Sequence, residues 1–401
     1  MGKVAYLLAG MLLAVVSVFA EQPGPRDEMR GPRIRTLASR PLPAGFIFGA
    51  NTHGVTDSAL DRMLEINMKW ARLDMSWSMV EPVLTEPPTY RWEVPDAVVA
   101  AYGSRGIKMH WILGYTPAWA SVSGAMSAVP KDANAVEHFR KFVRALAERY
   151  RYDVNYYSVW NEPNGLVYWE GSVDEYIDYL LVPAWEEIKA VDPSKKLVGP
   201  DLALLGSPHI TIEDFFAGLD KRNAGQYFDI IAQHAYADTP ADILEIFEDG
   251  SFAIDFWFIQ LFKTHEALLK IFDGTTGLKG KPVWLTEFGW RSDKVGEKRQ
   301  ANYIVETLHL ISGNPRFQNA FIYDIRDDPN HPRKFGMLRS DGTPKKVYDK
   351  LRNVFVQSAQ VLYENDEVDF NEQGTVINEP EDRRERVYID KDPRNQKRKE
   401  K

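Results

Sequence analysis

The chain has 401 residues, of which 44% are apolar and 12% aromatic, and this composition excludes a disordered or fibrous protein. The formal net charge of -8 shows no excess of basic residues that would bind an anionic polymer or surface, so we expect neither nucleic acid nor anionic lipid as a partner. The absence of cysteine excludes disulfides, thiolate metal sites, a cysteine nucleophile and a lipoprotein anchor.

The first twenty residues have the form of a secretory signal peptide. Lys3 precedes an apolar run that ends with Val18 and Ala20, which favours cleavage after Ala20. An uncleaved membrane anchor is the alternative, because the run is nearly long enough to span a bilayer. Residues 21–40 are polar, contain Pro and Gly, and are typical of a leader. We therefore expect a secreted or periplasmic protein.

Eight short apolar runs alternate with longer segments of helical period, and this alternation predicts the fold. The runs begin at Phe46, Lys69, Ile107, Val154, Lys196, Phe228, Pro282 and Ala320. After Asp132, apolar residues recur at steps of three and four from Val136 to Tyr150, as on one face of a helix. The pattern is typical of an α/β protein with a single closed parallel (β/α)8 barrel, here expected over residues 41–356.

An open, doubly wound sheet is the alternative fold. Such a sheet often has a glycine-rich, phosphate-binding turn after its first strand. This chain has "GANTHGVTDS" at that position, which disfavours the alternative. The insert from Ala237 to Gly280 contains "FAIDFWFIQLF", which predicts a helix near the site. The charged residues 357–401 predict a disordered tail.

Active sites of such barrels lie beyond the carboxyl ends of the strands. The polar residues expected there are Asn51, His53, Arg72, Asp74, His110, Asn161, Glu162, His234, Tyr236 and Glu287. Glu162 and Glu287 end the fourth and seventh strands and would face each other across the mouth of the barrel. Two carboxyl groups about 5 to 5.5 Å apart suit glycoside cleavage by double displacement, one as nucleophile and the other as acid and then base.

Aromatic walls would help the acid to keep its proton. The candidates for these walls are Trp160, Trp284, Trp290 and Tyr236. Asn161 is suited to bond a sugar hydroxyl. In a regular strand, however, Asn161 and Glu162 point to opposite faces, so both enter the site only if the strand breaks, with which Pro163 is consistent.

Several other candidates have a structural alternative. Arg72 either orients the nucleophile or pairs with Asp74 or a nearby glutamate. His110 binds substrate or fills the core, and His53 is a candidate in the first loop. The tryptophans that follow strands two to four are either sugar-stacking platforms or core residues; they are Trp77, Trp119 and Trp169.

Three motifs together resemble the clan A glycoside hydrolases, which are retaining (β/α)8 enzymes. They are "WNEPN" after strand four, "HAY" on strand six and "WLTEFGW" on strand seven. "WARLDMSWSMVEP" and "LGYTPAWAS" resemble early strands of family 39 and related family 5 members, and the match extends from Phe46 to about Tyr348. The resemblance implies that Glu162 is the acid/base, Glu287 the nucleophile and Asn161 a sugar contact.

The same resemblance implies that Arg72 and Tyr236 are partners of the nucleophile and that His234 lies beside them. On strand eight, "FIYDIRDD" lacks the tryptophan of many clan members, and Tyr323 is expected in its place. Many family 39 enzymes carry an added β-sandwich domain, for which we expect no room in this chain. This expectation disfavours an exo-acting xylosidase or iduronidase.

We therefore expect a retaining β-glycosidase that acts within a polysaccharide or oligosaccharide and needs no cofactor. No ligand cluster in the sequence indicates a metal, although a structural calcium ion is compatible with it. A non-catalytic glycan-binding barrel, a transglycosylase with the same residues and a metal-dependent barrel hydrolase are the alternatives.

Overall fold

The computed structural model describes residues 42–43, 45–203, 209–236 and 265–365. The expected signal peptide, the leader, the "FAIDFWFIQLF" stretch and residues 366–401 of the tail lie outside the described residues. Among the helices within the described ranges, none has the length and hydropathy needed to cross a bilayer.

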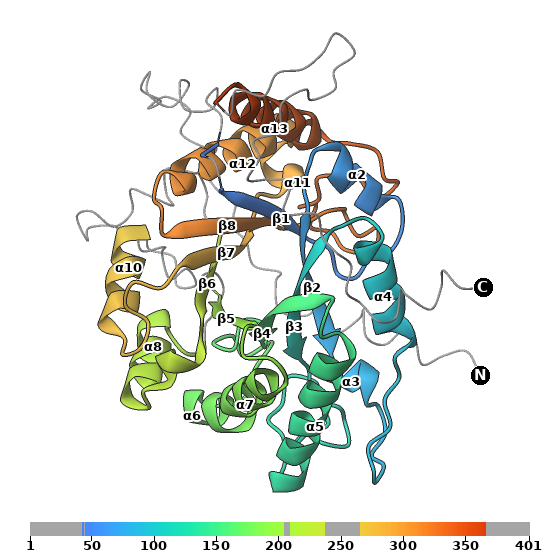
Figure 1. Ribbon diagram of the computed structural model, residues 1–401, viewed down its shortest axis with the longest axis vertical. Helices are drawn as coiled ribbons and strands as arrows, with labels where there is room; N and C mark the ends of the chain where they lie inside the picture. Colours follow the sequence, from blue (N-terminus) through green and yellow to red (C-terminus); the bar gives the residue numbers. More distant parts are fainter. Residues whose placement is uncertain (1–41, 44, 204–208, 237–264, 366–401) are drawn as a thin grey trace, which may run out of the picture. The chain divides into compact units, whose positions relative to one another are not determined.

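Eight parallel strands close into a barrel in chain order (Figure 1). They are β1 (Ile47–Asn51), β2 (Trp70–Ser76), β3 (Lys108–Gly114), β4 (Val154–Val159), β5 (Lys196–Leu202), β6 (Ile230–Ala235), β7 (Val283–Phe288) and β8 (Phe317–Ile322). Each predicted run overlaps one of these strands. β1 pairs with both β2 and β8, so the barrel prediction is confirmed and the open-sheet alternative is wrong.

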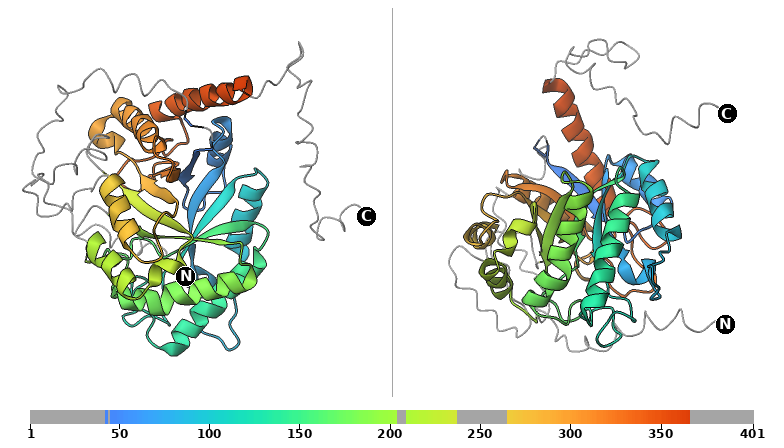
Figure 2. Two further views of the ribbon diagram at one scale, coloured as in Figure 1. Left: turned by 60° about the vertical axis from the view of Figure 1, so that its left-hand side comes forward. Right: turned by 60° about the horizontal axis from the view of Figure 1, so that its bottom comes forward.

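Helices surround the strands, as two further views also show (Figure 2). They are α2 (Ala59–Glu65), α3 (Trp77–Val80), α4 (Glu93–Gly103), α5 (Ala133–Arg149), α6 (Val173–Tyr176), the π-helix η2 (Ile177–Leu181), α7 (Val182–Val191), α8 (Ile212–Lys221), the 3₁₀ helix η3 (Ala224–Tyr227), α10 (His265–Gly274), α11 (Ser292–Val295), α12 (Glu297–Ser312) and α13 (Lys346–Asn365).

Helix α5 shows how the sequence builds this outer layer. The Asp132 carboxylate accepts a hydrogen bond from the Ala135 amide at 2.8 Å, which caps the first turn. The predicted stripe, including Phe139, Val143 and Leu146, is buried against the barrel.

The last helix corrects the expected boundary of the barrel domain. We expected a disordered tail from residue 357, but α13 continues to Asn365. Its buried residues Val347, Leu351 and Val354 recur at steps of three and four, and this apolar stripe holds the helix on the domain.

The part of the barrel interior that lies away from the carboxyl ends of the strands is an apolar cluster, which we call the floor. Its members are Trp70, Val198, Ile230, Ala232, Trp284 and Phe321. Gly49 makes room for it, since a Cβ atom there would lie 2.7 Å from the Phe321 ring. Trp284, which we expected to wall the active site, belongs to this floor, so that prediction is wrong. The strand's inward face carries Trp284 below the mouth rather than at it.

Candidate active site

The chain leaves β4 in a conformation that turns two successive polar side chains into the barrel. The strand ends at Val159, and Trp160 and Glu162 then have φ angles of 72° and 47°. Asn161 and Glu162 consequently both point inward, where Asn161 meets Arg72 and Glu162 meets His234. The predicted break in the strand is confirmed.

Left-handed backbone is concentrated at this end of the barrel. The described non-glycine residues with positive φ are His53, Asn67, Tyr115, Trp160, Glu162, Asp201 and Asn223. All except Asn67 and Asn223 lie at or just after the carboxyl end of a barrel strand. Such conformations cost about 1–3 kcal/mol each and persist where the surroundings impose them, which is typical of functional sites.

Glu287 is held through both of its carboxylate oxygens. Arg72 Nη1 donates to Oε1 at 2.7 Å, and the Tyr236 hydroxyl donates to Oε2 at 2.7 Å. The register between β6 and β7 shifts next to His234, which adds one residue to β7 and turns Glu287 inward beside that histidine. The carboxylate is thereby fixed and aimed into the mouth.

Arg72 is fully buried and joins the polar groups of the mouth. Nη1 also donates to Asn51 Oδ1 at 2.9 Å, and Nη2 donates to Asn161 Oδ1 at 3.0 Å and lies 3.3 Å from Asp201 Oδ1. Burial opposes its charge, but Asp201 and Glu287 together raise the pKa of Arg72 above its ordinary value. Its ion-pair partners are therefore Glu287 and Asp201, and not Asp74.

His234 lies between the two glutamates and Asp201. Its Nδ1 atom is 2.8 Å from Glu162 Oε1 and 3.6 Å from Glu287 Oε2, and Nε2 is 3.6 Å from Asp201 Oδ1. Burial disfavours the charged ring, yet Glu287, Asp201 and Glu162 outweigh it and raise the pKa of His234 to about 9. The three carboxylates therefore favour the charged form of this histidine.

Glu162 differs from Glu287 in its surroundings. Burial raises the pKa of Glu162 above its ordinary value, Glu287 adds to the rise, and the bond from His234 opposes it. Glu162 therefore holds its proton to higher pH than an ordinary carboxyl group, which suits a general acid. Glu287, with a donor on each oxygen, is arranged as a carboxylate.

The two carboxyl groups are close. One oxygen of Glu162, one oxygen of Glu287 and a ring nitrogen of His234 lie within 4.8 Å of one another. Within the described residues these three groups also form a possible ligand set for a metal ion. The Arg72 guanidinium and the Tyr236 hydroxyl already bond both oxygens of Glu287, so a second cation would compete with them.

His110 lies below this cluster and belongs to the core. It is fully buried, its ring packs edge-on against Trp284 with centroids 5.7 Å apart, and Nε2 donates to Ser158 Oγ at 2.8 Å. Ser158 in turn donates to Asp201. Burial lowers the pKa of His110 to about 3, so the ring is neutral. Our substrate-binding prediction for His110 is wrong, because the ring fills space between floor and mouth.

A second polar group lies at the rim. His53, whose side chain is 47% exposed, has Nδ1 3.4 Å from Asp74 Oδ2 and Nε2 3.3 Å from Asp324 Oδ2. Its ring stands edge-on to Tyr323 at 5.5 Å. Partial burial opposes the charge on His53, but Asp324 and Asp74 raise its pKa well above the ordinary value. His53 and Tyr323 are thus both at the mouth, as expected.

Tyrosines, rather than tryptophans, surround the carboxylates. Tyr236 donates to Glu287, Tyr115 donates to Asp74 at 2.9 Å, and Tyr323 packs edge-on to Tyr236 at 6.3 Å. Burial and the nearby Glu162 and Glu287 carboxylates raise the pKa of Tyr168 above its ordinary value.

Most tryptophans near the strand ends are core residues, which was one of the two interpretations of Trp77 and Trp169. Trp77, Trp160 and Trp169 are fully buried. Trp290 is 4% exposed and packs on Tyr303 of α12, so its predicted place at the site is wrong. Trp119 is half-buried, donates to the Glu81 carbonyl at 2.9 Å and packs edge-on against Trp77 at 5.7 Å, and its role in binding substrate stays a prediction. Indole rings of this size gain most by burial beneath the helices.

Sequence reasoning missed four residues of the site. Asp201 and Ser158 support Arg72 and His110, while Tyr115 and Tyr168 line the mouth. Asp201 has a usable signal in the sequence, because it directly follows the fifth apolar run, "KLVGP", and polar residues directly after the other runs are site candidates.

Comparisons with known proteins point to glycoside hydrolases. No protein-family model matches the chain. A β-xylosidase from Geobacillus stearothermophilus is 23% identical over 314 residues, which are 70% of this chain. The chain spans 59% of the length of that relative.

Solved structures share the barrel. A family 39 glycoside hydrolase from Bacteroides cellulosilyticus WH2 has a TM-score of 0.63 at 22% identity, over 79% of this chain and 64% of that one. A family 39 β-xylosidase from Caulobacter crescentus has a TM-score of 0.59 at 20% identity, over 78% and 71%. An exo-β-1,4-mannosidase from Opitutaceae bacterium strain TAV5 has a TM-score of 0.55 at 16% identity, over 79% and 60%. The chain therefore has the (β/α)8 barrel fold of the family 39 glycoside hydrolases and their structural relatives.

Proposed function

We propose that the protein is a retaining β-glycosidase that hydrolyses O-glycosidic bonds with two glutamates. The observation that carries the proposal is the pair Glu162 and Glu287, with carboxylate oxygens within 4.8 Å and unlike surroundings. Retaining enzymes hold these groups about 5–5.5 Å apart, whereas inverting enzymes need about 6.5–9.5 Å to admit a water molecule.

In the first step, Glu287 attacks the anomeric carbon and the glycosidic bond breaks. Arg72 and Tyr236 keep the attacking carboxylate oriented, and Glu162 gives its proton to the leaving oxygen. The raised pKa of Glu162 suits this donation.

In the second step, a water molecule hydrolyses the glycosyl ester on Glu287. Glu162, now ionised, takes a proton from that water, and the bond from the anomeric carbon to Glu287 breaks. His234, at 2.8 Å from Glu162 Oε1, stabilises the carboxylate in this interval. Both glutamates return to their starting protonation states.

We propose β-xylosides as the first substrates to test, because two of the similar proteins bear the name β-xylosidase. The names of these relatives favour release of sugars from chain ends, whereas the sequence favours endo action, which stays a prediction. Export likewise stays a proposal, supported by the apolar segment after Lys3.

The test is hydrolysis of a panel of aryl β-glycosides and soluble β-linked polysaccharides by the wild type and by Glu287→Gln. Glu137→Gln is the matched control, since Glu137 is exposed on α5 and lies outside the mouth. We expect cleavage by the wild type and the control and its collapse in Glu287→Gln, while product sizes separate endo from exo action. Equal activity in all three, or a wild type that binds the glycans but cleaves none, would contradict the proposal.

A further inference from the structure

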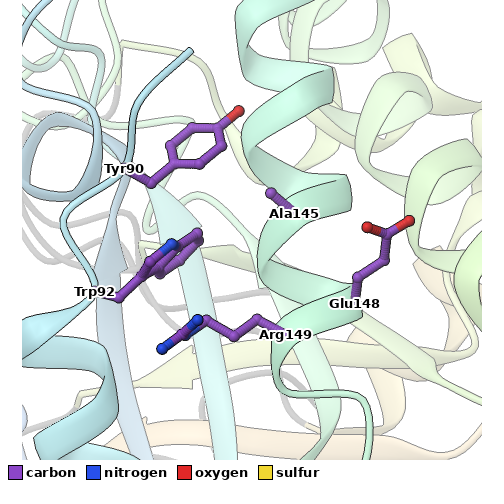
Figure 3. Close-up of a pocket in the computed structure, with 5 residues that line it drawn as sticks. All are labelled: Tyr90, Trp92, Ala145, Glu148 and Arg149. Carbon is purple, nitrogen blue, oxygen red and sulfur yellow. The ribbon is translucent and has the colours of Figure 1, made fainter. Parts of the chain in front are cut away.

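A hollow of about 490 Å³ lies on the outside of the barrel, between α5 and the segment that precedes α4 (Figure 3). Its lining residues are Tyr90, Trp92, Ala145, Glu148 and Arg149. None of them contributes to the mouth, and nothing in the two-glutamate chemistry uses them.

One wall of the hollow is aromatic. The Tyr90 and Trp92 rings have centroids 5.3 Å apart at an interplanar angle of 52°, and both side chains are half-buried. In the part of the chain that the structure describes, neither the Tyr90 hydroxyl nor the Trp92 indole N–H has a hydrogen-bond partner. The Tyr90 ring and the part of the Trp92 ring that Arg149 and Tyr150 leave uncovered therefore border the same space, together with these free polar groups.

The opposite wall is the outer face of α5. Ala145 is small and leaves the space open, as Figure 3 shows. Arg149 is fixed by Asp96, to which Nε donates at 2.9 Å and Nη2 at 2.6 Å, and its guanidinium lies 5.2 Å from the Trp92 ring centroid. Glu148 is exposed and forms no ion pair among the described residues.

These groups suit a neutral sugar better than other ligands. An aromatic ring packs on the apolar C–H face of a pyranose, and carboxylate and guanidinium groups bond its hydroxyls. Asp96 neutralises Arg149, and Glu148 adds a negative charge, so the hollow offers no excess of positive charge to a phosphate or a uronate. A shallow, polar-edged hollow also gives little apolar area to a lipid chain.

We propose that this hollow is a second glycan-binding site, which holds a neutral β-linked oligosaccharide segment apart from the active site. The choice of ligand class rests on the proposed glycosidase function. A polymer bound there stays at the protein surface between cleavage events, which raises the local concentration of substrate at the mouth.

The test blocks the hollow without touching the aromatic wall. Ala145→Trp fills the space from α5, and Ala100→Trp places the same side chain at an exposed alanine of α4 as the control. Both changes are made in a Glu287→Gln background, and migration is measured in native gels that contain soluble xylan, mannan or mixed-linkage β-glucan.

We expect at least one polymer to retard the parent and the control, and Ala145→Trp to weaken that affinity about tenfold. Equal retardation of all three proteins would overturn the proposal, as would the absence of retardation by every polymer. A third outcome would also overturn the proposal: the parent forms a dimer, and Ala145→Trp abolishes the dimer but not the retardation. The hollow would then bind a second copy of the chain.

Activity on an aryl β-xyloside separates this proposal from the proposed function. Ala145→Trp in the otherwise wild-type chain is expected to leave that activity unchanged, because a small substrate needs only the mouth. If Ala145→Trp abolishes the retardation and the wild type cleaves no glycoside, the second glycan-binding site is supported and the glycosidase function is rejected.

Discussion

The floor and the mouth of the barrel are built from the same eight strands, but they bury opposite kinds of side chain. In the floor, the Trp284 ring packs against Trp70 at 5.5 Å and Tyr156 at 4.9 Å. In the mouth, the buried Arg72 guanidinium is surrounded by carboxylate and amide oxygens. The floor therefore contributes stability through packing, while the mouth holds charges in fixed positions that are useful to a reaction.

His110 marks the boundary between the two regions. Its ring contacts Trp284 below, and its Nε2 atom donates to Ser158, which connects upward to Asp201. The comparison implies that substitutions in the floor lower the free energy of unfolding and leave the catalytic rate nearly unchanged. Substitutions in the mouth lower the catalytic rate and change the free energy of unfolding less. Substitutions on the two sides of His110 can separate these effects.

The largest effect on activity is expected for Glu287→Gly. Loss of the nucleophile should lower kcat on the order of 10⁴-fold or more, because no other described group is placed to attack the anomeric carbon. Added azide should restore turnover of an activated aryl β-glycoside and give the α-glycosyl azide, as chromatography of the product would show. A β-glycosyl azide from this variant would instead mean that Glu287 is not the nucleophile.

Trp284→Ala should have the largest effect on the floor. Removal of a buried indole leaves a cavity and is expected to lower the free energy of unfolding by about 3–5 kcal/mol. Urea titration measures this loss, and kcat per folded molecule should change little. Trp284→Phe is the matched control and should cost less. A large fall in kcat with unchanged stability would break the distinction between floor and mouth.

Ser158→Ala tests the connection across the boundary. It removes a hydroxyl that donates to Asp201 and accepts from His110, so two buried polar groups lose a partner. We expect a loss of about 1–3 kcal/mol in the free energy of unfolding. Ser104→Ala, at an exposed position after α4, is the control and should change it by much less. Equal effects of the two substitutions would show that Ser158 does not support Asp201.

The smallest effect is expected on the pH profile of a His234→Gln variant. His234 lowers the pKa of Glu162, so loss of its positive charge should raise that pKa further. Because the acid must be protonated, the alkaline limb of kcat/KM should move to higher pH, together with a lower maximum. An alkaline limb that stays in place or moves to lower pH would exclude His234 as the partner that controls Glu162.

The sequence predicted the barrel and the placement of Glu162 and Glu287 at its mouth, because both depend on short-range patterns. Apolar runs of strand length mark the eight strands, and acids directly after such runs mark the mouth. Arg72 and Tyr236 also lie where the resemblance to clan A implied, in contact with Glu287.

The aromatic residues were not predictable in the same way. Which ring faces a site depends on the register, and β7 contains an added residue that turns both Trp284 and Glu287 inward although they are three positions apart. Asp201 was missed although it directly follows the apolar run that begins at Lys196; in the structure it lies within β5, which continues to Leu202.

The most direct test of the account is the anomeric configuration of the first product. Proton NMR can monitor it during hydrolysis of the aryl β-glycoside that the enzyme cleaves fastest. Two displacements at the anomeric carbon, with Glu287 as the intermediate partner, predict that the β-anomer appears first and then mutarotates. Initial release of the α-anomer would contradict the account, because it would require a single displacement by water between Glu162 and Glu287.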